Sequence, residues 1–493
     1  MIRIHPEDNV AVAIADVPAG AHVRIDEREL ILREPIARGH KAALKLIRAG
    51  EVVKKYGFPI GHATADIEPG AWVHTHNLFT NLEGVVEYAY TPLAELPQRI
   101  EDGLTFEGFV RENGTVGIRN EIWIVPTVGC VNSTTEILAR QIQPELEGTS
   151  LEGVYAFPHP YGCSQLGADE FRTQQTLAGL VKHPNAGGVL VVGLGCEHNH
   201  IEAFQKVLGD FDPQRVRCIT CQDCEDELEA GRHALRELIA YASRFRRQSV
   251  PIAALKVGMK CGASDGLSGI TANPVVGAFS DLLAARGGTT VLTEVPEMFG
   301  AETLLMNRCA DQAVFAKCVS MINGFKDYYL RHDLPIYENP APGNKAGGIT
   351  TLEEKSLGCI QKGGTSPVMD VLQYGDILQT PGLNLLDGPG ADAVSITGLT
   401  AAGVHLILFT TGRGNPLGAP VPTVKISSNS HLAARKAHWI DFDAGQLLHD
   451  TSLPDLSQKL LHDVLDIASG KRRTCNEINQ YREIAIFKDG VML

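Results

Sequence analysis

The sequence predicts an α/β protein in which a small β-rich N-terminal domain is followed by two α/β domains with mostly parallel sheets. The first ninety residues consist of short strand-like stretches separated by closely spaced proline and glycine turns, which is typical of a small β module. From residue 104 onward, continuous apolar runs alternate with helix-like stretches, which indicates parallel sheets covered on both faces. The length of 493 residues suggests about three domains.

Changes in pattern along the chain predict the domain boundaries. The β-rich domain is expected over residues 1–95, with stretches such as VAVAIADVPAG and HVRIDERELILRE as strands. A polar segment with two prolines, YTPLAELPQRIEDG (90–103), is expected to be a linker. A second break near RRQSVP (246–251) separates a domain over 104–247 from one over 250–493.

Each α/β domain is predicted from its own apolar runs and helical stretches. The runs EIWIVPTVGC (121–130) and GVLVVGLGC (188–196) alternate with the helix-like stretches STTEILARQIQPEL and CEDELEAGRHALRELIAYASRF. The last domain contains TTVLTEV (289–295), VHLILFTTGRG (404–414) and a closing helix around LLHDVLDIASG. Ligands of open α/β sheets bind at the carboxyl ends of the strands, so we expect the functional residues in the loops that follow these runs.

Composition excludes some classes of partner. A formal net charge of −14 makes nucleic acid an unsuitable partner, because phosphate binding requires clustered cations. The longest apolar stretches fall far short of the ~20 residues that span a bilayer, so no membrane partner is expected. The N-terminus lacks a basic-then-apolar signal pattern, and eleven scattered cysteines indicate reduced thiols. A cytoplasmic location is therefore predicted.

The loop CGASDGLSGITANP (261–274) contains an unusual number of small polar groups. GASDG matches the G-x-S-x-G turn of serine hydrolases, with Ser264 as the nucleophile, but Gly266, Gly269 and Pro274 interrupt the helix that this turn requires. The alternative is a loop that hydrogen-bonds a polyhydroxylated ligand. That interpretation assigns hydroxyl binding to Ser264, Asp265, Thr271 and Asn273.

Other candidate binding groups lie in glycine-rich loops and near strand ends. The segment ENPAPGNKAGGITTLEEKSLG presents Asn344 and Lys345 beside glycines that allow close approach of a ligand. Arg413 in TTGRGNP can bind a carboxylate through two parallel hydrogen bonds. His40 and Lys41 lie at a turn, where they are either surface residues or a base and a cation. Glu294 follows an apolar strand.

Two sets of side chains are candidates for a metal site. His74 and His76 in WVHTHN would share one face of a strand and could bind a divalent ion, although an exposed polar strand edge explains them as well. Cys163, Cys196 and Cys261 each end an apolar run or open a glycine turn. They are either buried core thiols or the ligands of an iron site.

Longer motifs identify a family resemblance. The segments VRENGTVGIRNEIWIVPTVGCVN, YGCSQLG, CGASDGLSGITANP, TEVPEMFGAE, ENPAPGNKAGGITTLEEKSLG and HWIDFDAGQL resemble the altronate/galactarate dehydratase family over essentially the whole chain. The resemblance implies an N-terminal SAF-type β domain. It also implies a hydro-lyase that converts D-altronate to 2-dehydro-3-deoxy-D-gluconate and water. A related lyase acting on galactarate or a sulfonated hydroxy acid is the alternative, and a serine hydrolase is a distant one.

The resemblance implies ferrous iron as the cofactor, with manganese or a labile iron–sulfur cluster as alternatives. In the resulting hypothesis, His40 or Lys41 serves as the base or acid, Glu294 is a second acid/base group, and His74 with His76 binds the metal. The rival metal set is Cys163, Cys196 and Cys261. The remaining candidates bind substrate: Lys345 and Arg413 its carboxylate, and Ser264, Asp265, Thr271, Asn273 and Asn344 its hydroxyls. The expected partner is the sugar acid, and a homodimer is also allowed.

Overall fold

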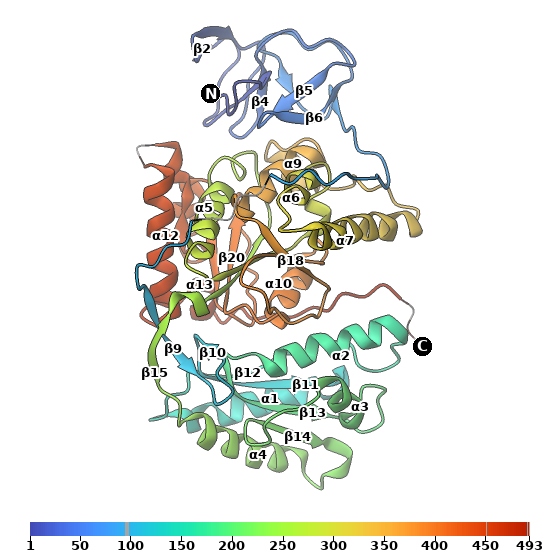
Figure 1. The fold of residues 1–493 in the computed structure, drawn as a ribbon, viewed down its shortest axis with the longest axis vertical. Coiled ribbons are helices and arrows are strands. Elements are labelled where there is room, and N and C mark those ends of the chain that lie inside the picture. Colours follow the sequence, from blue (N-terminus) through green and yellow to red (C-terminus); the bar gives the residue numbers. More distant parts are fainter. Residues whose placement is uncertain (94–97, 450, 491, 493) are drawn as a thin grey trace.

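The computed structural model describes residues 1–93, 98–449, 451–490 and 492, so part of the expected linker (94–97) lies outside the described residues. The β-rich N-terminal part, the large parallel sheet and the second domain follow one another along the longest axis of the molecule (Figure 1). The predicted fold class is confirmed: small β sheets come first, and two parallel sheets with helices follow. None of the described helices is long and apolar enough to cross a membrane.

The N-terminal part consists of short antiparallel strands joined by turns. One sheet has the order β1-β4-β7, a second pairs β2 with β3, and a third has the order β5-β6-β8. Val10, Val53 and Ile60 are buried and belong to the same apolar cluster as core residues of the third domain. The strands are β1 (Val10–Val12), β2 (His22–Ile25), β3 (Arg28–Ile31), β4 (Lys41–Ala43), β5 (Val52–Lys55), β6 (Phe58–Ala63), β7 (Trp72–Val73) and β8 (Leu78–Phe79).

The second domain combines a four-stranded parallel sheet with a small antiparallel one. The parallel sheet has the order β12-β11-β13-β14, and its central strands are completely buried because helices cover them. The antiparallel sheet has the order β10-β9-β15. Its strands are β9 (Thr105–Val110), β10 (Val116–Gly117) and β15 (Arg247–Pro251), and the parallel strands are β11 (Glu121–Pro126), β12 (Val154–Ala156), β13 (Ala186–Gly193) and β14 (Val216–Thr220). The helices are α1 (Asn132–Ile142), α2 (Gly167–Lys182), α3 (Ile201–Leu208) and α4 (Glu227–Ala242).

The third domain is built on a seven-stranded parallel sheet with the order β18-β19-β17-β16-β20-β21-β22. The strands are β16 (Lys256–Cys261), β17 (Thr289–Leu292), β18 (Val368–Leu372), β19 (Gly382–Leu386), β20 (Leu406–Thr411), β21 (Thr423–Ser427) and β22 (Phe442–Asp443). The helices are α5 (Ala272–Ala284), α6 (Glu302–Met306), α7 (Gln312–Arg331), α8 (Pro342–Ala346), α9 (Leu352–Cys359), α10 (Asp392–Ala401), α11 (Ser430–Arg435), α12 (Leu453–Ala468) and α13 (Cys475–Ile478).

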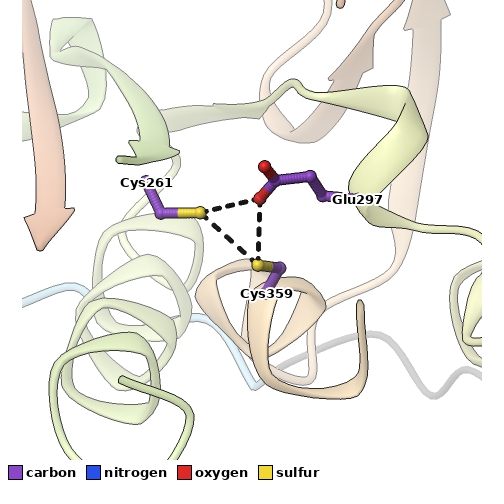
Figure 2. Close-up of side chains that lie close together, drawn as sticks. All are labelled: Cys261, Glu297 and Cys359. Atoms are coloured by element: carbon purple, nitrogen blue, oxygen red, sulfur yellow. Dashed lines mark hydrogen bonds between the residues drawn. The ribbon is translucent and has the colours of Figure 1, made fainter. Parts of the chain in front are cut away.

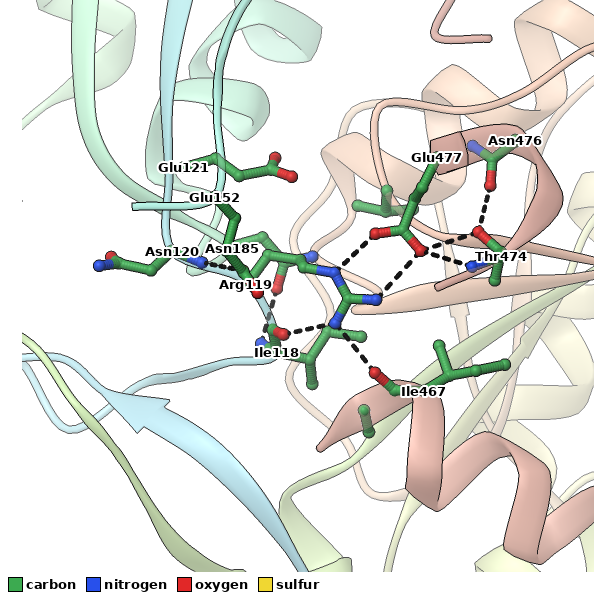
Figure 3. A network of polar contacts seen from close by, with 12 residues as sticks. Ile118, Arg119, Asn120, Glu121, Glu152, Asn185, Ile467, Thr474, Asn476 and Glu477 are labelled. Carbon is green, nitrogen blue, oxygen red and sulfur yellow. Dashed lines mark hydrogen bonds and ion pairs between the residues drawn. The ribbon is translucent and has the colours of Figure 1, made fainter. Parts of the chain in front are cut away.

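A buried ion pair joins the second and third domains. Arg119, just before β11, donates from Nε and Nη2 to the two carboxylate oxygens of Glu477 on α13, at 2.7 and 3.0 Å (Figure 3). Its Nη1 donates to the carbonyl of Ile467 near the end of α12 at 2.9 Å. Both side chains of the pair are only 1% exposed. The guanidinium of Arg119 thus binds two helices of the third domain, α12 and α13, to the start of β11 in the second.

Candidate functional site

A cationic cavity of about 250 Å³ lies where the N-terminal part meets the third domain. Arg38 comes from the N-terminal part, whereas Arg413 and Arg435 come from the loop after β20 and from α11. Asp265 and Asn429 also line the cavity. Guanidinium groups bind carboxylates through paired hydrogen bonds, and the carboxylate and amide can pair with hydroxyls. The cavity therefore suits a small polyhydroxylated anion.

Asp265 is held in place by a ring of donors. Its Oδ1 accepts from the hydroxyls of Ser268 at 3.0 Å and Ser428 at 2.8 Å, and its Oδ2 accepts from Asn429 Nδ2 at 3.2 Å. Gly412 is required beside it, because a Cβ there would lie 2.3 Å from Asp265 Cγ. Asp265 is therefore a fixed, buried acceptor at the wall of the cavity.

Two loops of the third domain touch the N-terminal part backbone to backbone. A Cβ on Gly266 would lie 1.9 Å from the carbonyl oxygen of Gly39, and a Cβ on Gly348 would lie 2.2 Å from the same atom. Any larger residue at these positions would push the two parts apart. This close approach brings His40 and Lys41 next to the loops that line the cavity.

Lys41 and Lys55 share one buried carboxylate, that of Glu354. Lys41 Nζ lies 2.8 Å from Oε2, Lys55 Nζ lies 2.9 Å from Oε1, and the three side chains are 1% exposed. Burial lowers the pKa of Lys41 to about 8, whereas the Glu354 carboxylate raises the pKa of Lys55 against its own burial. Despite its burial, the two ammonium groups lower the pKa of Glu354 to about 2. With two cations facing one anion, Lys41 is the group that releases a proton most easily.

A hydrogen-bond chain extends from Lys41 to His74. Lys41 Nζ donates to Thr350 Oγ1 at 2.6 Å, and this hydroxyl lies 3.0 Å from His74 Nδ1. Burial and the nearby Lys41 lower the pKa of His74 to about 4, so its ring is neutral. His40 donates from Nε2 to the carbonyl of Ala346 at 3.3 Å, and its Nδ1 accepts from Trp72 at 3.1 Å. Burial lowers the pKa of His40 as well. Both of its nitrogens are occupied, so His40 positions the Ala346 loop.

Cys261, Glu297 and Cys359 lie close enough together to hold a metal ion (Figure 2). The Sγ atoms of Cys261 and Cys359 are 2.9 and 3.1 Å from Glu297 Oε2 and 3.4 Å from each other. Cys261 ends β16, Glu297 follows β17, and Cys359 ends α9, so three elements converge here. Their potential ligand atoms lie within 4.8 Å of one another, and no other group of three His, Cys, Asp or Glu among the described residues does.

Charged neighbours surround this trio. Lys355 Nζ lies 2.7 Å from Glu297 Oε1, and Lys260 Nζ lies 3.1 Å from Glu294 Oε1. Glu294 Oε2 accepts from the backbone N–H of Cys261 at 2.7 Å. Burial and the neighbouring Cys261 raise the pKa of Glu294 well above its usual range. A small space of about 10 Å³, roughly one water molecule, is lined by Cys359, Glu354 and Asp265, so it extends from one member of the trio to the residue at the wall of the cavity.

Among the described residues, neither expected set of metal ligands forms a compact group. His74 is buried, whereas His76 is exposed against Trp72, and the described residues offer this pair no third ligand within 4.8 Å. The set of Cys163, Cys196 and Cys261 is not brought together either. Cys163 and Cys196 follow strands of the second domain's sheet, whereas Cys261 ends a strand of the third domain's sheet. The sequence places all three cysteines after similar apolar runs, and for this reason it predicts them at one edge of a single sheet.

Several expected substrate-binding residues use their polar groups within the protein. Thr271 donates to the carbonyl of Ser428 at 2.7 Å, Asn273 donates to that of Gly358 at 2.9 Å, and Asn344 donates to that of Ser264 at 2.9 Å. They shape the loops around the cavity. Lys345 is half-buried, while Arg413 lines the cavity and donates to the carbonyl of Gly343 at 3.2 Å.

Ser264 lacks the surroundings of a hydrolase nucleophile. Its Oγ is buried and has no hydrogen-bond partner in the described part of the chain, so no histidine activates it. The following helix α5 begins only at Ala272, eight residues later. The geometry therefore does not support the serine-hydrolase alternative.

The sequence interpretation missed the most unusual element of the site, α9. All eight residues of this helix are buried, although three of them are charged: Glu353, Glu354 and Lys355. The available signal was the charged run EEK between two glycine-rich stretches of the quoted motif. Periodicity places such a run on a solvent-exposed face, and only the loops and the N-terminal part that cover α9 bury it. Lys55, Cys359, Arg38 and Arg435 were missed as well, and Glu297 was noted only as a residue that follows an apolar strand together with Glu294.

The structure combines a parallel α/β domain, a β module over its loops, and a cationic cavity next to buried titratable groups. This combination defines an enzyme that acts on a small acidic substrate. Three family models match the chain in order. They are the altronate/galactarate dehydratase SAF domain over residues 1–81, the D-galactarate dehydratase/altronate hydrolase second domain over 108–243, and the D-galactarate/altronate dehydratase C-terminal domain over 252–492. The chain belongs to the altronate/galactarate dehydratase family.

Similarity to individual proteins extends over the full length. The chain is 55% identical to the altronate dehydratase of Escherichia coli (strain K12) over 500 residues, covering 100% of this chain and 99% of that protein. It is 50% identical to the altronate dehydratase of Bacillus subtilis (strain 168), with the same coverage. The galactarate dehydratase (L-threo-forming) of Escherichia coli (strain K12) is 33% identical over 99% of this chain and 96% of that protein. The chain is thus a hydro-lyase.

Proposed function

We propose that this protein removes water from D-altronate to form 2-dehydro-3-deoxy-D-gluconate. The observation that carries the proposal is the cavity, which is lined by three arginines together with the fixed carboxylate of Asp265. Full-length identity of 55% and 50% to proteins named altronate dehydratase supports the choice of sugar acid. Galactarate is the alternative, and the relative named galactarate dehydratase, at 33% identity, makes it the weaker one.

Arginines and a carboxylate bind different groups of the substrate in this proposal. Arg413 and Arg38 approach the cavity from opposite parts of the chain and bind the substrate carboxylate. Asp265 accepts from a hydroxyl of the sugar through Oδ2, whose partner in the described part of the chain is Asn429 Nδ2 alone. Asn429 holds Asp265 in place and so fixes the direction in which that hydroxyl is bound.

Removal of the proton next to the carboxylate is assigned to Lys41, one member of the buried lysine pair. The reaction requires a base that takes the proton next to the carboxylate and an acid that assists the departing hydroxyl. Lys41 is the proton acceptor in this proposal, because its lowered pKa of about 8 makes a neutral amine accessible near neutral pH. Glu354 and Lys55 fix it in place, and Thr350 and His74 continue the hydrogen-bond chain away from it. His40 positions the adjoining loop.

Ferrous iron is part of the proposal, with Cys261, Glu297 and Cys359 as the residues that would hold it. The donor set fits, because thiolates together with a carboxylate suit a first-row transition ion and the three ligand atoms already lie within 4.8 Å. A bound divalent ion would supply Lewis acidity that stabilises negative charge developing next to the carboxylate. Lys355 holds the second oxygen of Glu297 and keeps this carboxylate oriented.

The proposal also places the protein in the cytoplasm, as a homodimer. All eleven cysteines are free in the structure, which supports a reducing compartment. Sedimentation velocity at micromolar concentration tests the oligomeric state. A single boundary with the mass of one chain would contradict the homodimer.

A substrate panel tests the reaction. Purified protein with added Fe²⁺ is assayed on D-altronate, galactarate and a sulfonated hydroxy acid, and the 2-keto product is quantified. We expect kcat/KM for D-altronate to exceed the others at least tenfold. Arg413→Ala should raise KM for D-altronate by about 10- to 100-fold, the loss of one charge-assisted hydrogen-bond pair. Arg24→Ala, an exposed arginine on β2, is the control. If only galactarate yields a keto product, galactarate is the substrate. If none of the acids yields one, the proposed dehydration is rejected.

A further inference from the structure

Three glycine–cysteine pairs occupy equivalent places in the second domain, at a distance along the chain from every residue assigned to the reaction. Cys130 follows β11, Cys163 follows β12 and Cys196 follows β13, and each is preceded directly by glycine. These strands are neighbours in the order β12-β11-β13 and run parallel. Their carboxyl ends, and the loops with the cysteines, therefore share one edge of the sheet.

Hydrogen bonds tie the three loops to one another. The N–H of Gly129 donates to the carbonyl of Tyr161 at 2.9 Å, which joins the first loop to the second. The N–H of Asn199 donates to the carbonyl of Gly162 at 3.0 Å, and that of Ser164 donates to His198 Nδ1 at 3.2 Å, which joins the second to the third. The loop with Cys163 is therefore bound on one side to the residue before Cys130 and on the other to residues just after Cys196.

The glycines allow this close packing. A Cβ on Gly162 would lie 1.9 Å from the carbonyl oxygen of Thr127, and a Cβ on Gly129 would lie 2.8 Å from that of His159. Gly195, with φ +129°, would place a Cβ 2.7 Å from Gln222 Oε1. The contacts of Gly129 and Gly162 therefore hold the first two loops against each other, whereas the contact of Gly195 holds the third loop against Gln222, which follows β14.

Three helices direct their positive ends toward this edge. Helices α1, α2 and α3 begin at residues 132, 167 and 201, a few residues after the three cysteines. Within this described region none of the three has a side-chain N-cap, whereas α4 of the same domain is capped by Asp226. Uncapped N–H groups and the helix dipole stabilise negative charge, and a thiolate near a helix N-terminus is favoured for this reason.

We propose that Cys130, Cys163 and Cys196 hold an iron–sulfur cluster. Thiolates are the ligands that such clusters require, and each thiol loses its proton when its sulfur binds an iron. Among the described residues these three cysteines are not a group whose ligand atoms all lie within 4.8 Å, so they are not a preformed site for one ion. A cluster of several irons bridged by sulfide spans a wider gap between its thiolates, and the joined loops at one sheet edge supply three of them. Gln222 Nε2 donates to Cys196 Sγ at 3.5 Å, the kind of contact that tunes such a cluster. Cys130 and Cys196 are exposed, so a cluster can enter from solvent.

The site differs from the iron site of the proposed reaction in its ligands and in its domain, and it does not depend on that proposal. Three cysteines leave part of the cluster without a protein thiolate, so we expect sensitivity to oxygen. Inorganic sulfide is the component that separates the two sites. The Cys261–Glu297–Cys359 trio is compact enough for a single ion and needs no sulfide.

The test is anaerobic reconstitution of the full chain with iron, sulfide and a thiol reductant, followed by desalting. We expect acid-labile sulfide and iron in stoichiometric amounts, with the broad visible absorbance of a cluster. Cys130→Ser, Cys163→Ser and Cys196→Ser should each reduce labile sulfide at least fivefold, and the triple variant should abolish it. Cys475→Ser, a cysteine on α13, and Cys261→Ser should retain it. Circular dichroism and size-exclusion chromatography confirm that each variant is folded.

Three outcomes would overturn the cluster: wild-type protein without labile sulfide, a folded triple variant with unchanged sulfide, or zinc bound to these cysteines with no sulfide. Dehydration of D-altronate by protein loaded with Fe²⁺ in the absence of sulfide is measured in parallel. That arm tests the proposed function separately. Active enzyme without a cluster would reject the cluster and support the proposed dehydration. A cluster in a protein without dehydratase activity would support the cluster and reject the proposed dehydration.

Discussion

Replacing Glu477 by glutamine should loosen the attachment of the second domain to the third. In the structure its two carboxylate oxygens accept from Arg119 Nε and Nη2 at 2.7 and 3.0 Å, and both side chains are 1% exposed (Figure 3). Glutamine keeps the shape but removes the negative charge. The guanidinium of Arg119 is then buried opposite a neutral amide.

Two independent arguments give the size of the effect. Breaking a buried ion pair by removing one partner costs about 3–5 kcal/mol, because the remaining charge stays desolvated. The pKa of Glu477 provides the second argument: Arg119 lowers it from 4.5 to about 2 although the carboxyl is buried. A difference of about 2.5 units at 1.36 kcal/mol each is about 3 kcal/mol of stabilisation at neutral pH. The two agree.

The pH dependence has a definite sign. The folded-state pKa is depressed, so the stabilisation is fully present above about 4.5 and is lost as the pH falls toward about 2. The difference in stability between wild type and Glu477→Gln should therefore be largest near pH 7 and should shrink between pH 4.5 and 3. Glutamine does not titrate, so the decrease of the stability difference at low pH arises from protonation of Glu477 in the wild-type protein.

Differential scanning calorimetry measures both quantities. About 3 kcal/mol corresponds to a decrease of roughly 6–12 °C in the transition of a domain of this size at pH 7. Glu483→Gln, an exposed residue on the same C-terminal segment, is the control and should leave the transition unchanged. Equal transition temperatures for wild type and Glu477→Gln at pH 7, or a difference that stays constant down to pH 3, would refute the reasoning.

Three further predictions concern the site. Lys41→Arg should lower kcat by about 10²- to 10⁴-fold, the usual contribution of a proton-transfer group. In the wild type kcat/KM should rise with pH through about 8; this rise should disappear in Lys41→Arg and remain in Lys55→Arg. An equal decrease of kcat in the two variants would contradict the assignment. Glu354→Gln leaves two buried ammonium groups facing a neutral amide, and it should lower the free energy of unfolding by about 3–5 kcal/mol. Urea titration measures this change, and a urea midpoint equal to that of the wild type would contradict the prediction. Cys359→Ser should weaken Fe²⁺ binding at least tenfold by equilibrium dialysis, with Cys475→Ser as the matched control and equal affinities as the contrary result.

The sequence indicated several parts of the site through strand topology. Cys261, Glu294 and Arg413 were placed just after apolar runs, and these runs are β16, β17 and β20, which are neighbours in one parallel sheet. Because carboxyl ends of parallel strands meet at one edge, residues far apart in sequence were expected near one another. Asp265 was likewise expected from its glycine-rich loop, and it lines the cavity.

The sequence could not show which sheet each strand joins. Cys163, Cys196 and Cys261 follow similar apolar runs, but two of them belong to the second domain's sheet and one to the third's. Pairing between strands is a long-range contact that depends on how whole domains pack, and a local pattern does not encode it. For the same reason the trio of Cys261, Glu297 and Cys359 could not be assembled from spacing.

By itself, the amino-acid sequence determined the local elements, the order of the three parts and the chemical groups available to each loop. Only the tertiary structure decided that His40 and Lys41 lie against the loops near residues 346 and 350, because backbone contacts of Gly39 with Gly266 and Gly348 set that position. It also decided that α9 is buried, so that Lys41, Lys55 and Glu354 share one dry environment. Burial is a property of what packs on a residue: here it lowers the pKa of Lys41, whereas the opposite charges that share the dry environment set the direction of the pKa shifts of Lys55 and Glu354.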